Sequence, residues 1–272
     1  MSLEETKQLL QTYRIKPNKL LGQNFMVESS LYSKLCVYAS LGSSDIVLDA
    51  GAGFGFLSRF LADRCKAVIA VEKDQQVVQV LQEQVKGFDN ITVIQGDVLK
   101  TKLPEFNKVI AIPPYYLSSH LITWLLENRI DCAVLILQKE FAHRLVADVG
   151  SEDYGWLTVI TYQDAEVELL DLVPKGMFYP QPEVDSVILR IKPWNKTPFE
   201  VTDKKLFKQL VKWLFTQRNK KLGKVLAPFL RTNLKLNKQD SEKLALTLPF
   251  HDKRARELQP KDFGAIANVI AK

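Results

Sequence analysis

A glycine-rich turn between two apolar segments is the feature of this chain that most limits its fold. The apolar run 46–50 ends in the pattern Asp-x-Gly-x-Gly-x-Gly, and a second apolar run, 67–71, ends in Glu72. Glycine lets a backbone turn sharply and approach a bound ligand closely, because it has no side chain. An acid at the end of the second strand can accept hydrogen bonds from both hydroxyl groups of a ribose. The pattern predicts a strand, a turn, a helix and a second strand that together hold an adenosine-type cofactor.

Apolar strands and amphipathic helices alternate over the first two thirds of the chain. The predicted strands are residues 46–50, 67–72, 91–95, 108–112, 132–137, 166–173 and 185–191, and helices are predicted at 56–64 and 75–85. The first five strands are nearly continuous in apolar character, which is typical of buried parallel strands. The last two lie close in sequence, with a proline-rich loop between them. The fold class is therefore predicted to be α/β, a doubly wound Rossmann-like sheet of seven strands whose last pair is antiparallel at the edge.

The end of the chain differs from the rest in charge and in predicted structure. Residues 201–272 carry 17 Lys and Arg against 6 Asp and Glu, whereas residues 1–200 carry 20 against 25. A proline-containing linker at 193–198 precedes predicted helices at 204–215, 222–230, 238–246 and 260–271. We therefore predict two domains, 1–193 and 199–272, of which the second is small, helical and basic. Its charge indicates either a polyanion partner or a solvated basic surface.

Composition argues against several other classes of protein. The chain of 272 residues has no apolar run long enough to cross a membrane and no secretory signal at its N-terminus. Its three cysteines and three histidines are scattered and lack the spacing of a metal site. These features predict a cytoplasmic protein that binds no membrane and no metal, and a monomer is the default expectation.

The acid beside the glycine turn distinguishes between two adenosine cofactors. Dinucleotide dehydrogenases place a pyrophosphate at a Gly-x-Gly-x-x-Gly turn, and the negative Asp49 would be a poor neighbour for it. S-adenosylmethionine instead carries a positive sulfonium and an amino group, which a carboxylate attracts. The sequence thus favours S-adenosylmethionine over a nicotinamide cofactor. A third possibility is a tight strand–helix turn that binds no ligand.

Three further segments follow predicted strands, where ligands bind in open α/β sheets. Asp97 could accept a hydrogen bond from an adenine amino group, or it could cap a helix. The turn Pro113-Pro114-Tyr115 holds carbonyl groups and an aromatic ring rigidly, and the ring could stack on an extruded base. Phe178, in the proline-rich loop, could present a second stacking face. Each aromatic segment could alternatively be a packed structural turn.

These segments occur in a characteristic order along the chain. The order is Leu21-Gly22-Gln23-Asn24-Phe25, Asp49-Ala50-Gly51-Ala52-Gly53, Glu72-Lys73-Asp74, Gly96-Asp97, Pro114-Tyr115 with Ser118-Ser119, Leu137-Gln138-Lys139-Glu140, Tyr154-Gly155, Phe178-x-Pro180-x-Pro182-x-Val184, Phe215-Thr216-Gln217-Arg218-Asn219-Lys220 and Arg256-Glu257-Leu258. In this order they resemble the ribosomal RNA adenine N6,N6-dimethyltransferases. That family includes the kasugamycin-sensitivity methyltransferases and, more distantly, the erythromycin-resistance methylases. The resemblance extends from about residue 20 to residue 263.

The resemblance implies an S-adenosylmethionine-dependent enzyme that dimethylates two adjacent adenines near the 3′ end of small-subunit ribosomal RNA. It also implies a role in ribosome biogenesis, with the small ribosomal subunit as partner. Cofactor contacts are expected at Gln23, Asn24, Phe25, Gly51, Gly53, Glu72, Lys73, Asp97 and Val98. The catalytic positions are expected to be Ile112, Pro113, Pro114, Tyr115 and Phe178, with the adenine between Tyr115 and Phe178. RNA contacts are expected from Arg218, Lys220, Lys221 and Lys224.

One residue departs from the family pattern. The family motif is Asn-x-Pro-Tyr/Phe, and this chain has Ile112 where the asparagine is expected; the nearest asparagine, Asn107, precedes the strand. The amide oxygen of that asparagine would accept a hydrogen from the adenine amine and so localise its lone pair. Ile112 therefore motivates an alternative, a catalytically weak or inactive ribosome assembly factor that keeps its cofactor and RNA sites.

Overall fold

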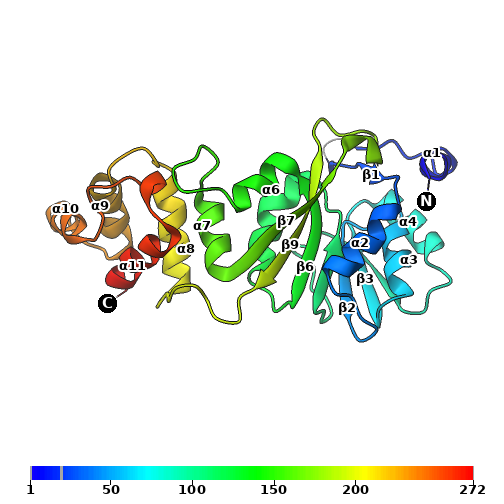
Figure 1. Ribbon diagram of the computed structural model, residues 1–272, viewed down its shortest axis with the longest axis horizontal. Helices are drawn as coiled ribbons and strands as arrows, with labels where there is room; N and C mark the ends of the chain where they lie inside the picture. The colour runs from blue at the N-terminus through cyan, green and yellow to red at the C-terminus, as the bar shows by residue number, and fades with distance from the viewer. Residues whose placement is uncertain (1, 19–20, 272) are drawn as a thin grey trace. The chain divides into compact units, whose positions relative to one another are not determined.

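The computed structural model describes residues 2–18 and 21–271 (Figure 1). Its first part contains α1 (Leu3–Thr12), β1 (Phe25–Met26), α2 (Ser30–Tyr38), β2 (Ile46–Ala50), α3 (Phe56–Ala62), β3 (Ala67–Glu72), α4 (Gln75–Gln84), β4 (Ile91–Gln95), β5 (Lys108–Ala111), α5 (Ser118–Leu125) and β6 (Cys132–Gln138). The later elements are α6 (Lys139–Leu145), α7 (Trp156–Asp164), β7 (Ala165–Val173), β8 (Phe178–Tyr179), β9 (Ser186–Pro193), α8 (Lys204–Phe215), α9 (Leu222–Asn233), α10 (Lys238–Thr247) and α11 (Pro260–Ile270).

Seven strands form one mixed sheet in the order β4-β3-β2-β5-β6-β9-β7. Strands β2 to β6 run parallel, and β9 runs antiparallel to β6, between it and the edge strand β7. The predicted doubly wound α/β sheet with its reversed pair at one edge is thus confirmed. From β2 the chain builds the sheet first outward through β3 and β4 and then, from β5, in the other direction. This reversal leaves a crevice at the carboxyl ends of β2 and β5, where ligands bind in folds of this kind.

The predicted strands agree with those in the structure, apart from small differences at their ends. Strand β5 stops at Ala111, one residue before the predicted end at Ile112. Pro113 and Pro114 follow directly, and proline has no N–H with which to continue a ladder. Ile112 therefore lies in the connection beyond the strand rather than within it.

Helices α2 and α3 pack on one another and cover one face of the sheet. Val47, Ile110 and Val134 from three neighbouring strands are fully buried in one cluster that also contains Leu35 of α2 and Leu61 of α3. Side chains alternate between the two faces of a strand, so alternate residues of β2, β5 and β6 reach this cluster. The burial of both faces explains why these strands are apolar throughout.

A second, two-stranded sheet joins segments that are far apart in the sequence. Strand β1 pairs antiparallel with β8, so that Phe25 lies opposite Tyr179 and Met26 lies opposite Phe178. The N-terminal segment and the proline-rich loop are thereby held together at the same place. Two residues on each side are too few to give a recognisable strand pattern, and the sequence did not predict this pairing.

The chain forms two compact units, residues 1–142 with 166–193, and 143–165 with 194–272. The first unit ends at Pro193, while the segment 143–165 groups with the C-terminal helices rather than with the sheet that surrounds it in sequence. Tyr154 explains this grouping, because it is fully buried and its hydroxyl donates to the carbonyl of Leu258 at 2.7 Å. In the same unit α8 buries Phe207, Leu210 and Leu214 along one side.

Candidate cofactor and adenine site

One pocket lies at the carboxyl ends of the central strands, where the sheet order reverses. It is lined by the ends of β3 and β4, by the glycine turn after β2, by the proline turn after β5, and by the segment before β1. All fourteen residues predicted for cofactor contact and catalysis line it: Gln23, Asn24, Phe25, Gly51, Gly53, Glu72, Lys73, Asp97, Val98, Ile112, Pro113, Pro114, Tyr115 and Phe178. Segments separated by more than 150 residues in sequence thus meet in one place.

Glu72 is a pocket carboxylate that accepts three backbone hydrogen bonds. Its Oε2 accepts the backbone N–H of Gly53 at 3.0 Å, and its Oε1 accepts those of Lys73 at 2.7 Å and Asp74 at 2.9 Å. Burial raises the pKa of Glu72, and the three N–H groups oppose that rise. The side chain therefore ties the glycine turn to the start of α4 while it keeps lone pairs for ribose hydroxyls.

Asp97 begins a turn rather than a helix, so the predicted capping role is not seen. Its Oδ1 accepts the N–H of Leu99 at 3.1 Å, and residues 98–100 form the turn. Its Oδ2 lies 3.3 Å from Nζ of Lys73, whose side chain is about half exposed. An adenine amino group that approaches Asp97 therefore meets an oxygen shared with a lysine, a partner that the sequence did not reveal.

The glycine turn leaves room that no other residue would leave. Gly51 has a φ of +82°, and a Cβ atom there would lie 2.7 Å from Cδ of Pro114. Gly53 has a φ of +57°, and a Cβ atom there would lie 3.4 Å from the Phe25 ring. The pocket therefore offers bare backbone on one side and carboxylates at two neighbouring strand ends. These residues fit an adenosine cofactor with a positively charged methionine part.

The segment before β1 is fixed against this pocket by its own side chains. Nε2 of Gln23 donates to Oδ2 of Asp74 at 2.8 Å, which links the segment to the start of α4. The Phe25 ring stacks on Phe54 with centroids 4.3 Å apart and planes inclined by 6°. A stretch that composition alone describes as a loop is thus an ordered wall of the pocket.

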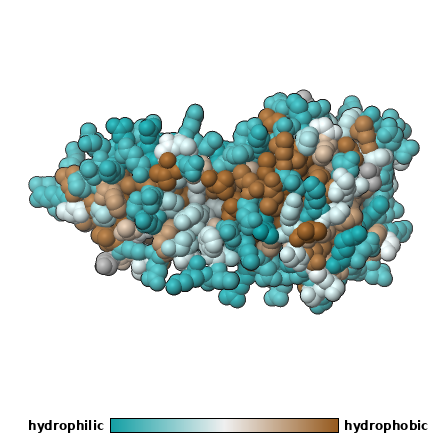
Figure 2. Space-filling model, viewed as in Figure 1, coloured by the Kyte–Doolittle hydropathy of each residue, from teal (hydrophilic) through white to brown (hydrophobic). Residues whose placement is uncertain are grey.

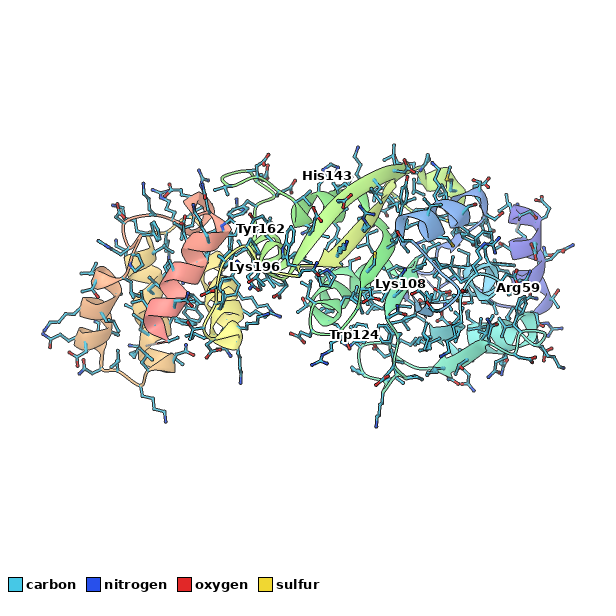
Figure 3. All side chains as sticks on the ribbon, turned by 60° about the horizontal axis from the view of Figure 1, so that its bottom comes forward. Arg59, Lys108, Trp124, His143, Tyr162 and Lys196 are labelled. Atoms are coloured by element: carbon cyan, nitrogen blue, oxygen red, sulfur yellow. The ribbon has the colours of Figure 1, made fainter. Side chains whose placement is uncertain are left out.

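Ile112 lines the pocket at the position of the expected asparagine, and it also packs against the buried cluster of the sheet. Asn107 cannot replace it, because its amide is used at the other end of the strands. Its Oδ1 accepts the N–H of Ile46, and its Nδ2 donates to Asp45 and Asp131. Lys108, labelled in Figure 3, pairs with Asp45 at this same edge, with 2.9 Å between Nζ and Oδ2.

Tyr115 and Phe178 are neighbours, but they do not form two parallel faces. Their ring centroids are 6.5 Å apart and the planes are inclined by 72°. The Tyr115 hydroxyl lies 2.7 Å from Oγ of Ser186, a fully buried residue at the start of β9. A flat base between the two rings therefore requires one ring to rotate. The hydrogen bond to Ser186 fixes the position of the Tyr115 hydroxyl, and Phe178 is only 3% exposed within the buried cluster.

The Tyr115→Phe variant is expected to lose about tenfold in methyl-transfer rate, because the ring remains while its orientation is no longer fixed. Its free energy of unfolding should fall by about 1–2 kcal/mol, since Oγ of Ser186 is left buried without its partner. Single-turnover kinetics and thermal melting measure the two effects. Tyr162→Phe is the matched control, because Tyr162 is 48% exposed and lies in the second unit. Equal rates for wild type and Tyr115→Phe would contradict this role.

Asp49 lies beneath the glycine turn and is only 1% exposed. Its Oδ2 accepts the hydroxyl of Ser58 at 2.7 Å. Burial raises the pKa of Asp49 from 3.8 to about 7; the Ser58 hydrogen bond opposes this rise, and the charge of Glu72 adds to it. A sulfonium or ammonium group nearby would favour the ionised form.

Asp49 should make the protein less stable as the pH rises. The folded protein holds a proton that the unfolded chain releases near pH 3.8, so this stabilisation is complete below that pH and is lost as the pH rises through about 7. Between pH 3.8 and about 7, the free energy of unfolding of the wild type should fall by up to about 1.4 kcal/mol per pH unit relative to that of Asp49→Asn. Thermal melting of both proteins between pH 4.5 and 7.5 tests this. Parallel stability curves would show that Asp49 ionises normally.

The four tail residues predicted to contact RNA differ in their surroundings. Arg218 donates from its guanidinium to the carbonyls of Ser151 at 2.9 Å and Glu152 at 2.8 Å, so it holds a loop within its own unit. Lys220, Lys221 and Lys224 are exposed. The three lysines are therefore better placed than Arg218 to meet phosphates.

Within residues 2–18 and 21–271 no helix is long and apolar enough to span a membrane. The same residues contain no group of three or more His, Cys, Asp or Glu side chains that could hold a metal ion.

Comparison with known proteins agrees with the site. A model of the family described as ribosomal RNA adenine dimethylase matches residues 14–271. A protein named probable ribosomal RNA small subunit methyltransferase A from Methanosarcina acetivorans is 40% identical over 97% of each chain. One of the same name from Thermococcus sibiricus is 35% identical over 96% of this chain and 95% of its own.

Two solved structures are similar over almost the whole chain. A dimethyladenosine transferase from Plasmodium falciparum has a TM-score of 0.77 and 28% identity, covering 91% of this chain and 97% of its own. The 23S rRNA methyltransferase ErmE has a TM-score of 0.65 and 27% identity, covering 92% of this chain and 100% of its own.

Fold and site together define a Rossmann-like methyltransferase that uses S-adenosylmethionine. The chain belongs to the ribosomal RNA adenine dimethylase family. These matches support the predicted enzyme, and they favour neither the nicotinamide alternative nor the catalytically weak assembly factor.

Proposed function

We propose that this protein transfers methyl groups from S-adenosylmethionine to N6 of two adjacent adenines near the 3′ end of small-subunit ribosomal RNA, twice on each adenine. Relatives over nearly its full length are named small-subunit methyltransferases, which supports this choice of substrate. The observation that carries the proposal is the single pocket in which Glu72, Asp97 and Tyr115 meet. In this role the protein acts in ribosome biogenesis, in the cytoplasm, as a monomer and without a metal.

The bound cofactor supplies an electrophilic methyl group on a sulfonium centre. Glu72 would hold the ribose hydroxyls and Asp97 the adenine amino group of that cofactor. Tyr115, fixed by Ser186, would stack on the target base, and Phe178 would close on its other face. The base must leave its stack to reach the pocket, which is easiest for an unpaired adenine. Proximity and orientation then bring N6 in line with the methyl carbon.

The remaining acceptors for the amine hydrogens would be the backbone carbonyls of Ile112 and Pro113 in the proline turn, because the Pro114 carbonyl accepts the N–H of Leu117 at 3.0 Å. Such a rigid turn holds its carbonyls in place, because two consecutive prolines restrict the backbone. One carbonyl acceptor with an apolar neighbour would support transfer, although less well than a carbonyl with an amide beside it.

Methyl transfer from tritiated S-adenosylmethionine to undermethylated small subunits tests the proposal. We expect label in small-subunit RNA, recovered after digestion as N6,N6-dimethyladenosine, and no label in large-subunit RNA. Absence of label in small-subunit RNA, with cofactor binding demonstrated by calorimetry, would overturn the proposed activity.

A further inference from the structure

A cavity of about 680 Å³ lies between helices α9 and α10 of the second unit and has no part in the site described above. On α9 its lining residues recur every three to four positions, at Lys224, Ala227 and Arg231, so they share one side of the helix. On α10 the lining includes Ser241 and Leu246. We call this cavity the α9–α10 groove.

The floor of the groove is apolar although it opens to solvent. Ala227 and Pro228 form it on the α9 side, and Leu246, which is 59% exposed, forms it on the α10 side. Gly223 keeps the floor close to the backbone, because a Cβ atom there would lie 3.2 Å from Cδ2 of Leu246 and 3.3 Å from the carbonyl oxygen of His251. The groove therefore exposes an apolar surface that a ligand can contact.

The rim of the groove is predominantly cationic. Four exposed basic side chains line it, together with two carboxylates: Lys221, Lys224, Arg231 and Lys238, with Glu242 and Asp252. None of the four basic side chains forms an ion pair with any residue that the structure describes. In Figure 2 the surface over this end of the molecule is mostly hydrophilic, with smaller hydrophobic patches among the hydrophilic atoms. Unpaired cations around an apolar floor suit a ligand that joins phosphate to a flat ring.

The geometry points to the α9–α10 groove as a binding site for one unpaired nucleotide of the RNA substrate. Its base would lie on Pro228 and Leu246, and its flanking phosphates would contact Lys221 and Lys224. The carboxylates can accept hydrogen bonds from a base amino group or from the 2′-hydroxyl that distinguishes RNA. A duplex does not fit this role, because a paired base cannot leave its stack without cost. The inference rests on the proposed function only in taking RNA as the substrate.

The test compares two pairs of full-length variants. Leu246→Glu places a negative charge on the apolar floor of the groove, and Val269→Glu makes the same type of change at a 46% exposed position on α11. Lys224→Ala removes one cation of the rim, and Lys205→Ala removes an exposed lysine of α8. Filter binding at several salt concentrations uses undermethylated small subunits and a mixed-sequence RNA of about 12 nucleotides, single-stranded or as a duplex. Thermal melting shows that each variant is folded.

Leu246→Glu should weaken single-strand binding by about tenfold or more, because it replaces an apolar contact with a charge that repels the phosphates. A plot of the logarithm of the binding constant against the logarithm of salt concentration has a slope that reports phosphate contacts. Lys224→Ala should make this slope smaller by about one unit. Both controls should stay within about twofold of wild type. Equal binding by Leu246→Glu and Val269→Glu, or equal wild-type affinity for single strand and duplex, would overturn the inference. Failure of the proposed function would give a different result. The wild type would then transfer no methyl groups, while Leu246→Glu would still weaken RNA binding.

Discussion

The Glu72→Gln variant should bind S-adenosylhomocysteine about 100-fold more weakly than wild type, the effect of losing charged hydrogen bonds in a partly buried site. The carboxylate accepts three backbone N–H groups, from Gly53, Lys73 and Asp74. A glutamine would turn an NH₂ group toward at least one of these donors. The variant should therefore disturb the glycine turn as well as remove the acceptor for the ribose. Isothermal calorimetry measures the affinity.

Glu83→Gln is the matched control for this variant, because Glu83 is exposed on α4 outside the pocket. Thermal melting of both variants shows the temperature below which the calorimetry reports folded protein. Wild-type affinity in folded Glu72→Gln would mean that the nucleoside does not lie at the end of β3.

The Ile112→Asn variant should transfer methyl groups about 10²–10³-fold faster than wild type, the usual effect of one positioned polar partner in a transition state. Ile112 lines the pocket beside the proline turn, so an asparagine there would present its amide oxygen to the target amine. The amine lone pair would then be less delocalised into the ring. Cofactor affinity should change little, because cofactor contacts lie elsewhere. Single-turnover kinetics with saturating subunits measures the chemical step.

Ile112→Leu controls for the volume change at this position and should leave the rate within a few-fold of wild type. An unchanged or lower rate in Ile112→Asn would show that this site already localises the lone pair by other means. In that case the carbonyl groups of the proline turn would be the first candidates.

The central sheet was predictable because its signals are local. Strands β2, β3, β5 and β6 are largely buried on both faces and read as short apolar runs, and an acid stands at or just after the carboxyl ends of β3 and β4. Glu72 and Asp97 could therefore be predicted to lie close together, since neighbouring parallel strands end at the same edge, and both line the same pocket. The long amphipathic helices followed from spacing in the same way, as α8 shows with Phe207, Leu210 and Leu214.

The features that sequence could not supply are pairings between distant segments. The ribbon of β1 and β8 aligns Met26 with Phe178, and Nζ of Lys73 lies 3.3 Å from Oδ2 of Asp97. Neither pairing leaves a periodic signal, because each depends on one or two residues. The resemblance implied an RNA contact at Arg218, and nothing in the sequence indicated that its guanidinium donates to the carbonyls of a loop. The hydrogen bond of Tyr115 to Ser186 was invisible for the same reason.

A crystal structure with S-adenosylhomocysteine bound is the most direct test of the central claim, that one crevice at the strand ends holds the cofactor against the adenine slot. The account predicts density with the ribose hydroxyls on Glu72, the adenine amino group near Asp97, and the sulfur atom directed toward Ile112 and Tyr115. Density for the nucleoside elsewhere on the protein, or a sulfur atom directed away from Tyr115, would contradict it.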